Sequence, residues 1–255
     1  AGSKWIGFKN FKFLFATKDA FIMVRNTLLY NILWIFVGAV FGITVAILFN
    51  EIQNKIAKKF YQTAILLPYL ISIVVVAYLV YAFLATDTGL VNNAIVKGLL
   101  GKKEGVAWYM ESKFWPFILT FVQQWKQIGF GMLLYLASIL GIDKTYYEAA
   151  MLDGATKWQQ IKSITLPLLK PTIIMLVILN LGQIFRSDFG LFYQVPMNQG
   201  ALYSTTQTID TYVYRALMVN NNVGMSAAAS FLQSVVGFIF IVTAKGSDTP
   251  VLYSH

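Results

Sequence analysis

Five long apolar segments constrain this sequence more than any other feature. Their ranges are Phe21–Phe49, Phe60–Leu84, Phe114–Leu140, Pro171–Phe189 and Val223–Thr243. A helix needs about 20 apolar residues to cross a hydrocarbon core roughly 30 Å thick, where the backbone finds no water to bond. We therefore predict an all-α polytopic membrane protein, with polar connections at 50–59, 85–113, 141–170 and 190–222.

Composition supports a lipid environment and excludes several kinds of site. Hydrophobic residues make up 57% of the chain and charged residues 12%, whereas a soluble domain has about 25% charged residues. There is no cysteine, and the single histidine is the last residue, His255. We therefore expect no catalytic or metal site. The net charge of +9 comes from scattered basic residues, which favours contact with lipid headgroups over nucleic-acid binding.

Polar side chains interrupt two of the apolar segments. The third contains Gln123, Lys126 and Gln127, and the fourth contains Asn180, Gln183, Arg186 and Ser187. A charge at membrane depth costs at least about 2.5–3.5 kcal/mol, so it normally faces a cavity or a partner. One interpretation is a substrate pathway, since amides both donate and accept hydrogen bonds and suit a ligand rich in hydroxyl groups. The other is helix–helix bonding, with Lys126 satisfied by carbonyls near Gly129 and Gly131.

Small residues recur at helical spacing in the first and last segments. The first series is Gly38, Gly42 and Ala46, and the second is Ser226, Ser230, Gln233, Ser234 and Gly237. Such stripes let helix backbones approach closely. Both packing within the chain and contact with a second membrane subunit remain open.

The connection between the third and fourth segments has strong helix-boundary signals. Thr145 with Glu148, and Thr156 with Gln159, predict two capping boxes. Gly154 lies between them, where a left-handed residue would end the first helix. Pro167 and Pro171 are expected to break the second helix. The prediction is a helix–turn–helix elbow at the membrane surface.

The same connection carries a family resemblance. Glu148-Ala149-Ala150, then Gly154, then Ile164-Thr165-Leu166-Pro167 has the spacing of the EAA loop of bacterial ABC importer permeases. In that family the loop forms a coupling helix that docks on a cytoplasmic ATPase. The resemblance implies a coupling loop over 143–170. It assigns coupling roles to Glu148, Ala149, Ala150, Asp153 and Gly154, and Glu148 can also cap its own helix.

Further segments resemble sugar permeases of the maltose-transporter type. They are Trp5–Phe11, Arg25–Leu28, Leu67-Pro68 and Trp125-Lys126. Two others, Phe185–Pro196 and Ile209–Arg215, are similar to the polysaccharide and complex-oligosaccharide branch. The family implies the ABC importer type I transmembrane fold with six spans, one more than is visible here. We therefore expect a permease domain over 1–243 and an atypical tail over 244–255.

The resemblance implies a carbohydrate importer in the bacterial plasma membrane. Its expected partners are a second homologous permease, two cytoplasmic ATPases that bind ATP and Mg²⁺, and an extracellular solute-binding protein. This chain itself should bind no cofactor. The alternatives are a secondary transporter and a membrane enzyme, but Asp188, near a helix end, is the one acidic residue within the five segments, and no nucleophile–base pair is present there. The loop, rather than the spread of lysines, sets the orientation, with 50–59 and 141–170 inside.

Overall fold

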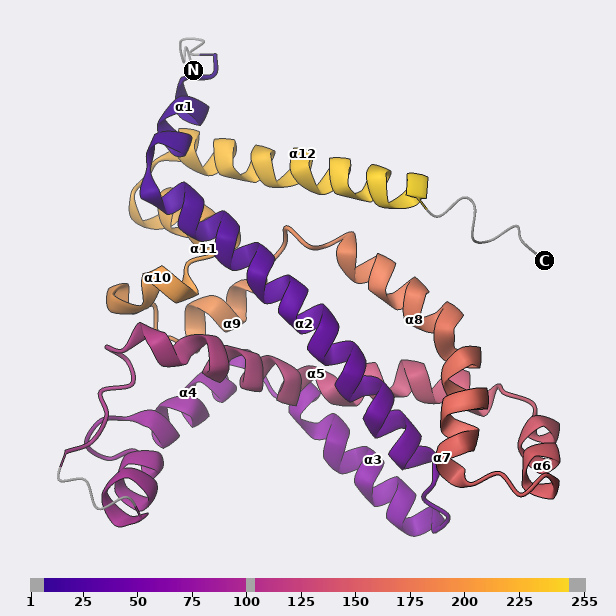
Figure 1. Cartoon of the computed structure of the whole chain (residues 1–255). Helices are drawn as coiled ribbons and strands as arrows, with labels where there is room; N and C mark the ends of the chain where they lie inside the picture. The colour runs from indigo at the N-terminus through magenta and orange to yellow at the C-terminus, as the bar shows by residue number, and fades with distance from the viewer. Residues whose placement is uncertain (1–6, 100–103, 248–255) are drawn as a thin grey trace. The chain divides into compact units, whose positions relative to one another are not determined.

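The chain folds into helices joined by short turns (Figure 1), as the sequence predicts. The computed structural model describes residues 7–99 and 104–247, and these contain no strand. The α-helices are α1 Lys9–Ala16, α2 Lys18–Asn50, α3 Lys55–Leu70, α4 Ile73–Leu84, α5 Trp115–Leu140, α6 Lys144–Leu152, α7 Lys157–Gln160, α8 Leu166–Leu181, α9 Phe189–Gln194, α10 Tyr203–Thr206, α11 Ile209–Tyr214 and α12 Val223–Ser247. Three π-helical turns (Val91–Leu99, Ile161–Thr165 and Arg215–Val219) and two 3₁₀ turns (Ser112–Phe114 and Gly200–Leu202) complete the set.

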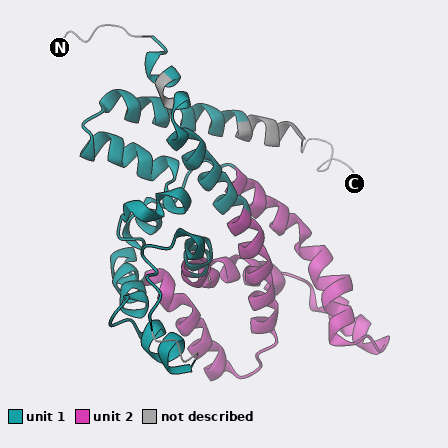
Figure 2. Cartoon of the chain, turned by 60° about the vertical axis from the view of Figure 1, so that its left-hand side comes forward, with its two compact units in different colours: residues 1–32, 71–121, 182–255 teal, residues 33–70, 122–181 magenta. Residues whose placement is uncertain are grey.

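The chain divides into two compact units, coloured separately in Figure 2. Unit 1 comprises residues 1–32, 71–121 and 182–255, and unit 2 comprises residues 33–70 and 122–181. Because α2 and α5 are long, each contributes residues to both units. The first residues of Trp5–Phe11 and the tail beyond Ser247 lie outside the described residues.

Unit 2 has an apolar core shared by α2, α5 and α8. Its buried members are Ala46, Phe49, Met132, Tyr135, Leu136, Ile139 and Leu169. A Cβ on Gly42 would lie 3.0 Å from the Tyr135 ring, and one on Gly38 would lie 3.4 Å from the Gln124 amide. The small residues of the first segment therefore allow α2 to pack on α5 within the chain, which supports the first of the two interpretations.

The second apolar segment is bent, whereas the sequence predicts one span over Phe60–Leu84. Helices α3 and α4 meet at 95° across Ile71 and Ser72. Pro68 lies in the last turn of α3, where it removes one backbone donor and disfavours continuation of the helix. Ser72 then adopts an extended conformation (ψ 140°) and α4 begins at the next residue. The segment is a broken span.

The fourth apolar segment begins earlier and ends earlier than predicted. One continuous apolar helix runs over Lys157–Leu181, so neither Pro167 nor Pro171 breaks it. The π-helical turn Ile161–Thr165 explains why the helix continues through the two prolines. At its end the Leu166 N–H donates to the Ile161 carbonyl, five residues back, which widens the helix directly before the ring of Pro167. Pro171 is also accommodated inside α8.

The five predicted spans differ in whether each is one long helix, a bent pair of helices or a short helix. Within the described residues, α2 and the Lys157–Leu181 helix are each long and apolar enough to cross a membrane. Two bent pairs qualify if each counts as one span, namely α3 with α4 and α5 with α6, the latter bent by 69°. The fifth segment, within α12, is a shorter apolar helix over Val223–Ile239.

In unit 1, the Arg25–Leu28 motif holds the chain around α10 and α11. Arg25 and Asn26 donate to the Ser204 carbonyl at 2.7 and 3.2 Å, and Asn26 also donates to the Gln207 carbonyl at 2.9 Å. The fully buried Thr27 accepts from the Ile209 N–H at 3.1 Å. Side chains on α2 thus satisfy backbone groups between short helices.

Candidate functional site

The elbow formed by α6 and α7 is the most sharply delimited feature of unit 2. Helix α6 starts at Lys144 because the Asp143 side chain accepts a bond from the Thr145 N–H at 2.9 Å. The bond from this backbone N–H, reinforced by one from the Thr145 side chain, holds the pKa of Asp143 below its usual range. The predicted capping box of Thr145 with Glu148 is therefore wrong, since Asp143 takes the N-cap position two residues earlier.

The end of α6 follows the prediction at Gly154. This residue has φ +75°, a conformation that glycine adopts without a steric penalty. The Ala155 N–H donates to the Ala150 carbonyl at 2.8 Å, and the Gly154 N–H donates to the Met151 carbonyl at 3.1 Å. These two bonds form a Schellman motif, which satisfies carbonyls that the helix end leaves without partners.

Helix α7 starts with the second predicted capping box, which the structure confirms. The Gln159 N–H donates to Thr156 Oγ1, and the Thr156 N–H donates to Gln159 Oε1 at 2.7 Å. Both ends of the four-residue turn between α6 and α7 are therefore fixed by local bonds.

The outer face of the elbow is exposed and largely apolar. The exposed fractions are 90% for Leu152, 70% for Trp158 and 55% for Met151. Glu148 and Ala149 are also exposed, while Ala150 is half-buried. Large apolar side chains grouped on one exposed element are typical of an interaction site.

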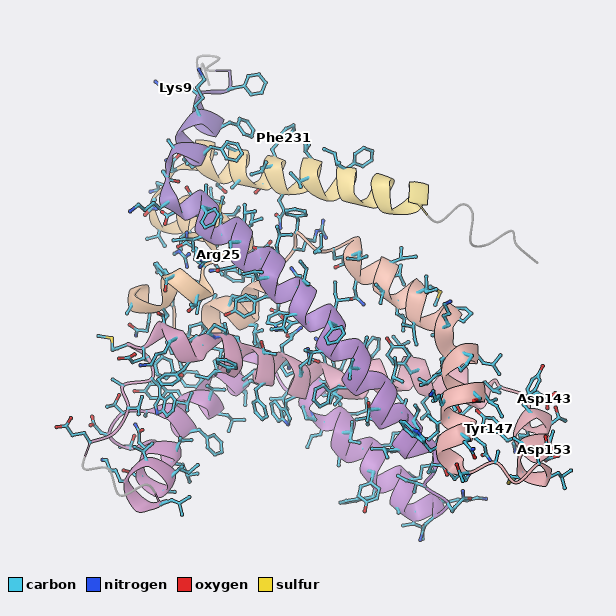
Figure 3. The ribbon with its side chains drawn as sticks, in the orientation of Figure 1. Lys9, Arg25, Asp143, Tyr147, Asp153 and Phe231 are labelled. Atoms are coloured by element: carbon cyan, nitrogen blue, oxygen red, sulfur yellow. The ribbon has the colours of Figure 1, made fainter. Side chains whose placement is uncertain are left out.

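Polar contacts on the inner side of the elbow connect its own parts and attach it to the rest of unit 2. Tyr147 lies on the side of α6 that faces α7 (Figure 3), and its hydroxyl is 2.9 Å from Thr165 Oγ1. The buried Gln160 donates to the Ala155 carbonyl at 3.2 Å. Lys157 pairs with Glu51 at 3.2 Å, but both side chains are exposed, so this pair contributes little to stability.

Lys126, predicted to face either a pathway or nearby carbonyls, meets a carbonyl. Its side chain is buried, and Nζ donates to the Pro68 carbonyl at 3.2 Å. That carbonyl lies at the break between α3 and α4, rather than near Gly129 and Gly131 as the sequence suggested. Gln123 and Gln127 are half-buried on the same helix. Gly129 instead permits close packing, since a Cβ there would collide with the Ile65 carbonyl oxygen.

Asn180, Gln183 and Ser187 are predicted to lie within the fourth span, on one face of its helix, but this is wrong because α8 ends at Leu181. Asn180 is exposed and its side chain donates to the Leu176 carbonyl of its own helix at 2.7 Å. Gln183 and Arg186 are exposed in the non-helical segment 182–188 that follows. Within the described part of the chain, the Arg186 guanidinium forms no hydrogen bond or ion pair.

Three side chains from other helices of unit 1 satisfy the backbone of the segment 182–188. Asn31 donates to the Ile184 and Arg186 carbonyls, both at 2.8 Å, and Gln233 donates to the Phe185 carbonyl at 2.7 Å. Asp210 accepts from the Ser187 N–H and from its hydroxyl, both at 2.7 Å. Gln233 also donates to Asp210 at 3.2 Å. These residues form the polar cluster Asn31–Asp210–Gln233.

Sequence reasoning missed the roles of this polar cluster. The sequence pattern places Gln233 in a stripe of small residues and predicts no bonding role for Asn31 or Asp210. An available signal was the amide of Asn31 within the apolar run that follows Thr27 in the first segment, since such a group in lipid must find a partner. The partner's position could not be predicted, because it depends on where α8 ends.

This chain is similar to known components of membrane transport systems. Residues 38–248 match the family model described as "Binding-protein-dependent transport system inner membrane component". The polygalacturonan/rhamnogalacturonan transport system permease protein YteP of Bacillus subtilis (strain 168) is 33% identical over 96% of this chain and 74% of its own length.

Two crystal structures are also similar to this chain. A bacterial ABC transporter involved in the import of the acidic polysaccharide alginate has a chain that is 34% identical, with a TM-score of 0.90 over 98% of this chain and 86% of that one. The bacterial alginate ABC transporter in complex with an alginate pentasaccharide-bound periplasmic protein gives 33% identity and a TM-score of 0.89, over 97% of this chain and 84% of that one.

Proposed function

The chain belongs to the family of inner membrane components of binding-protein-dependent transport systems, and we propose that it forms half of the path by which an oligosaccharide or polysaccharide enters a bacterial cell. Its fold is that of the ABC importer type I transmembrane domain. A permease of this family is not the enzyme of the system, because a separate subunit hydrolyses ATP. The carbohydrate class is supported by the substrates that the similar proteins are described as carrying.

The elbow is the proposed contact with the ATPase. The observation that carries this assignment is the exposure of Glu148, Ala149, Met151 and Leu152 on α6, a helix whose ends are both fixed, together with the exposed Trp158 on α7. A rigid element with unburied apolar surface suits docking, because little conformational entropy is lost when a partner covers it. Ala150, Asp153 and Gly154 complete the proposed coupling set by shaping the end of α6.

In the assembly that we propose, this chain works with four other protein molecules. They are a second homologous permease, two cytoplasmic ATPases that bind ATP with Mg²⁺, and an extracellular solute-binding protein. The last is supported by the similar transporter solved with a periplasmic protein. With the elbow on the ATPase, residues 50–59 and 141–170 lie at the cytoplasmic side of the plasma membrane, and lipid surrounds the outer helical faces.

The proposed sugar path includes the polar residues of the third segment and those around 182–188. The set is Gln123, Lys126, Gln127, Asn180, Gln183, Arg186 and Ser187. Gln233 lies near the middle of α12, and Asn31 lies near the middle of α2. Because both bond the irregular backbone of 184–187, that backbone lies beside the middle of each helix. Non-helical backbone at membrane depth is tolerated only where protein buries it or where it lines a wet cavity. The exposed side chains of Gln183 and Arg186 support the second situation.

Uptake by the reconstituted system tests the proposed function. The chain is purified with its second permease and ATPase, placed in proteoliposomes, and supplied with the binding protein. Fragments of alginate, polygalacturonan and a neutral α-glucan are then offered. We expect uptake of at least one fragment that requires ATP and survives collapse of the proton gradient. Uptake by this chain without the ATPase, driven by an ion gradient, would show a secondary transporter instead.

A further inference from the structure

A pair of hydroxyl groups links α6 of the elbow to the π-helical turn that precedes α8. Tyr147 lies one residue before Glu148 but faces inward, where its hydroxyl meets Thr165 Oγ1 at 2.9 Å. Thr165 is 5% exposed, so the Thr165 side of this contact is buried, while Tyr147 is half-buried. Both residues line the same small cavity, together with Asn50, Glu51 and Gln160.

The π-helical turn is the weakest part of the helix that leaves the elbow. Ile161–Thr165 has bonds that reach five residues back, as from the Leu166 N–H to the Ile161 carbonyl. Pro167 follows and has no N–H to donate to the Ser163 carbonyl, four residues before it. Two regular bonds are therefore altered or missing within a few residues, and helices bend most readily at such positions.

We propose that the Tyr147–Thr165 pair transmits movement of α6 into α8, with the π-helical turn as the hinge. Tyr147 is then a positioning residue for the coupling of ATP hydrolysis to transport, although it does not contact the ATPase. The proposal rests on the proposed function of the elbow and extends it to residues on its inner side. Without this pair, α6 still moves with the ATPase, but only part of that movement reaches α8.

The test compares the amount of sugar carried per ATP hydrolysed in the reconstituted full complex. The probe is the fragment with the highest uptake by the unmodified complex among the alginate, polygalacturonan and α-glucan fragments. Tyr147→Phe and Thr165→Val each remove one hydroxyl and keep the side-chain shape. We expect either change to lower the ratio of transport to ATP hydrolysis by about fivefold, the factor that corresponds to one hydrogen bond. Association with the ATPase and the apparent affinity for sugar should not change.

The chain offers a matched control on the same helix. Ser138 and Thr172 form a second hydroxyl pair, at 2.8 Å, between α5 and α8. Ser138→Ala removes a comparable bond away from the elbow and should leave the ratio unchanged. Thr165→Ser keeps the hydroxyl and removes only a methyl group, so it should also keep the ratio normal. If Tyr147→Phe does not assemble, the contrast between Thr165→Val and Thr165→Ser decides the question.

The proposal is overturned if Thr165→Val retains the normal ratio, or if Ser138→Ala lowers the ratio as much as Thr165→Val does. Failure of the proposed function looks different. In that case the unmodified complex itself shows no ATP-dependent uptake, whereas failure of this inference leaves the unmodified complex active and the variants fully coupled.

Discussion

The elbow of unit 2 and the irregular segment 182–188 of unit 1 differ in how their backbone N–H and C=O groups find hydrogen-bond partners. The elbow uses residues within a few positions of each helix end, such as Asp143, Gly154 and Thr156. The segment 182–188 uses Asn31, Asp210 and Gln233, which are distant in sequence. An element whose bonds are local stays ordered when it is exposed. A segment held by distant side chains depends on the packing of several helices. Substitutions in the elbow should therefore affect function, whereas substitutions of the distant side chains that hold 182–188 should affect stability.

The largest expected effect on stability is at Asp210. Asp210→Ala leaves the Ser187 N–H without its acceptor and removes a partner of Gln233. Each buried donor left unsatisfied costs about 1–3 kcal/mol, so we expect a loss of about 2–4 kcal/mol for the group. Thermal unfolding of the purified complex in detergent measures this. An unchanged melting temperature would show that 182–188 does not depend on the cluster.

Gln233→Leu should have a smaller effect of the same kind. It removes the donor to the Phe185 carbonyl and one donor to Asp210. Hydrogen bonds within membranes contribute about 0.6–2 kcal/mol, and we expect a loss in that range by the same unfolding measurement. Ser234→Ala is the matched control, because Ser234 is exposed and bonds only its own helix at the Ser230 carbonyl. Equal losses in the two variants would contradict the assignment.

Gly154→Ala should separate function from stability in the elbow. A Cβ at Gly154 meets no atom within 4 Å, so the cost is the left-handed backbone alone, about 1 kcal/mol. That cost falls on the end of α6, and the unfolding temperature of the whole chain should change little. ATP-driven uptake should decrease several-fold. A variant with normal uptake would show that the shape of the α6 end does not matter for coupling.

The smallest stability effect is expected at Gln183, which is exposed in the segment 182–188. If its amide lines the sugar path, Gln183→Ala should shift the apparent affinity or the preference among oligosaccharides and leave stability within about 0.5 kcal/mol. Uptake and unfolding are measured on the same preparation. A stability loss with unchanged selectivity would place Gln183 in packing rather than in the pathway.

The two regions also differ in how far the sequence predicts them. Gly154 and the Thr156–Gln159 box were predicted correctly, because caps depend on neighbouring residues. The sequence pattern favours Thr145 over Asp143 as the cap of α6, because both are acceptable caps and the choice depends on where the preceding helix ends. The EAA spacing predicted the family, which the comparisons confirm.

Errors in the sequence prediction arose where distant contacts override local pattern. The fourth segment was placed too late in the chain because the prolines were expected to break a helix that a π-helical turn preserves. The second was expected to be straight, although it bends after Pro68, whose carbonyl binds Lys126. Apolar composition alone specifies neither the end of α8 nor the partners that allow it to end there.

Binding of the ATPase to the exposed face of α6 tests the central claim most directly. Leu152 is 90% exposed, and burying a leucine contributes about 1.5–3 kcal/mol, or roughly 10- to 150-fold in affinity. Leu152→Asp should therefore weaken ATPase association by at least about tenfold in a pull-down titration, with no change in the unfolding temperature of the permease. Met110→Asp, at another exposed apolar residue in the 85–113 connection, should bind the ATPase normally. Normal association of Leu152→Asp, or equal losses in both variants, would contradict docking through the elbow.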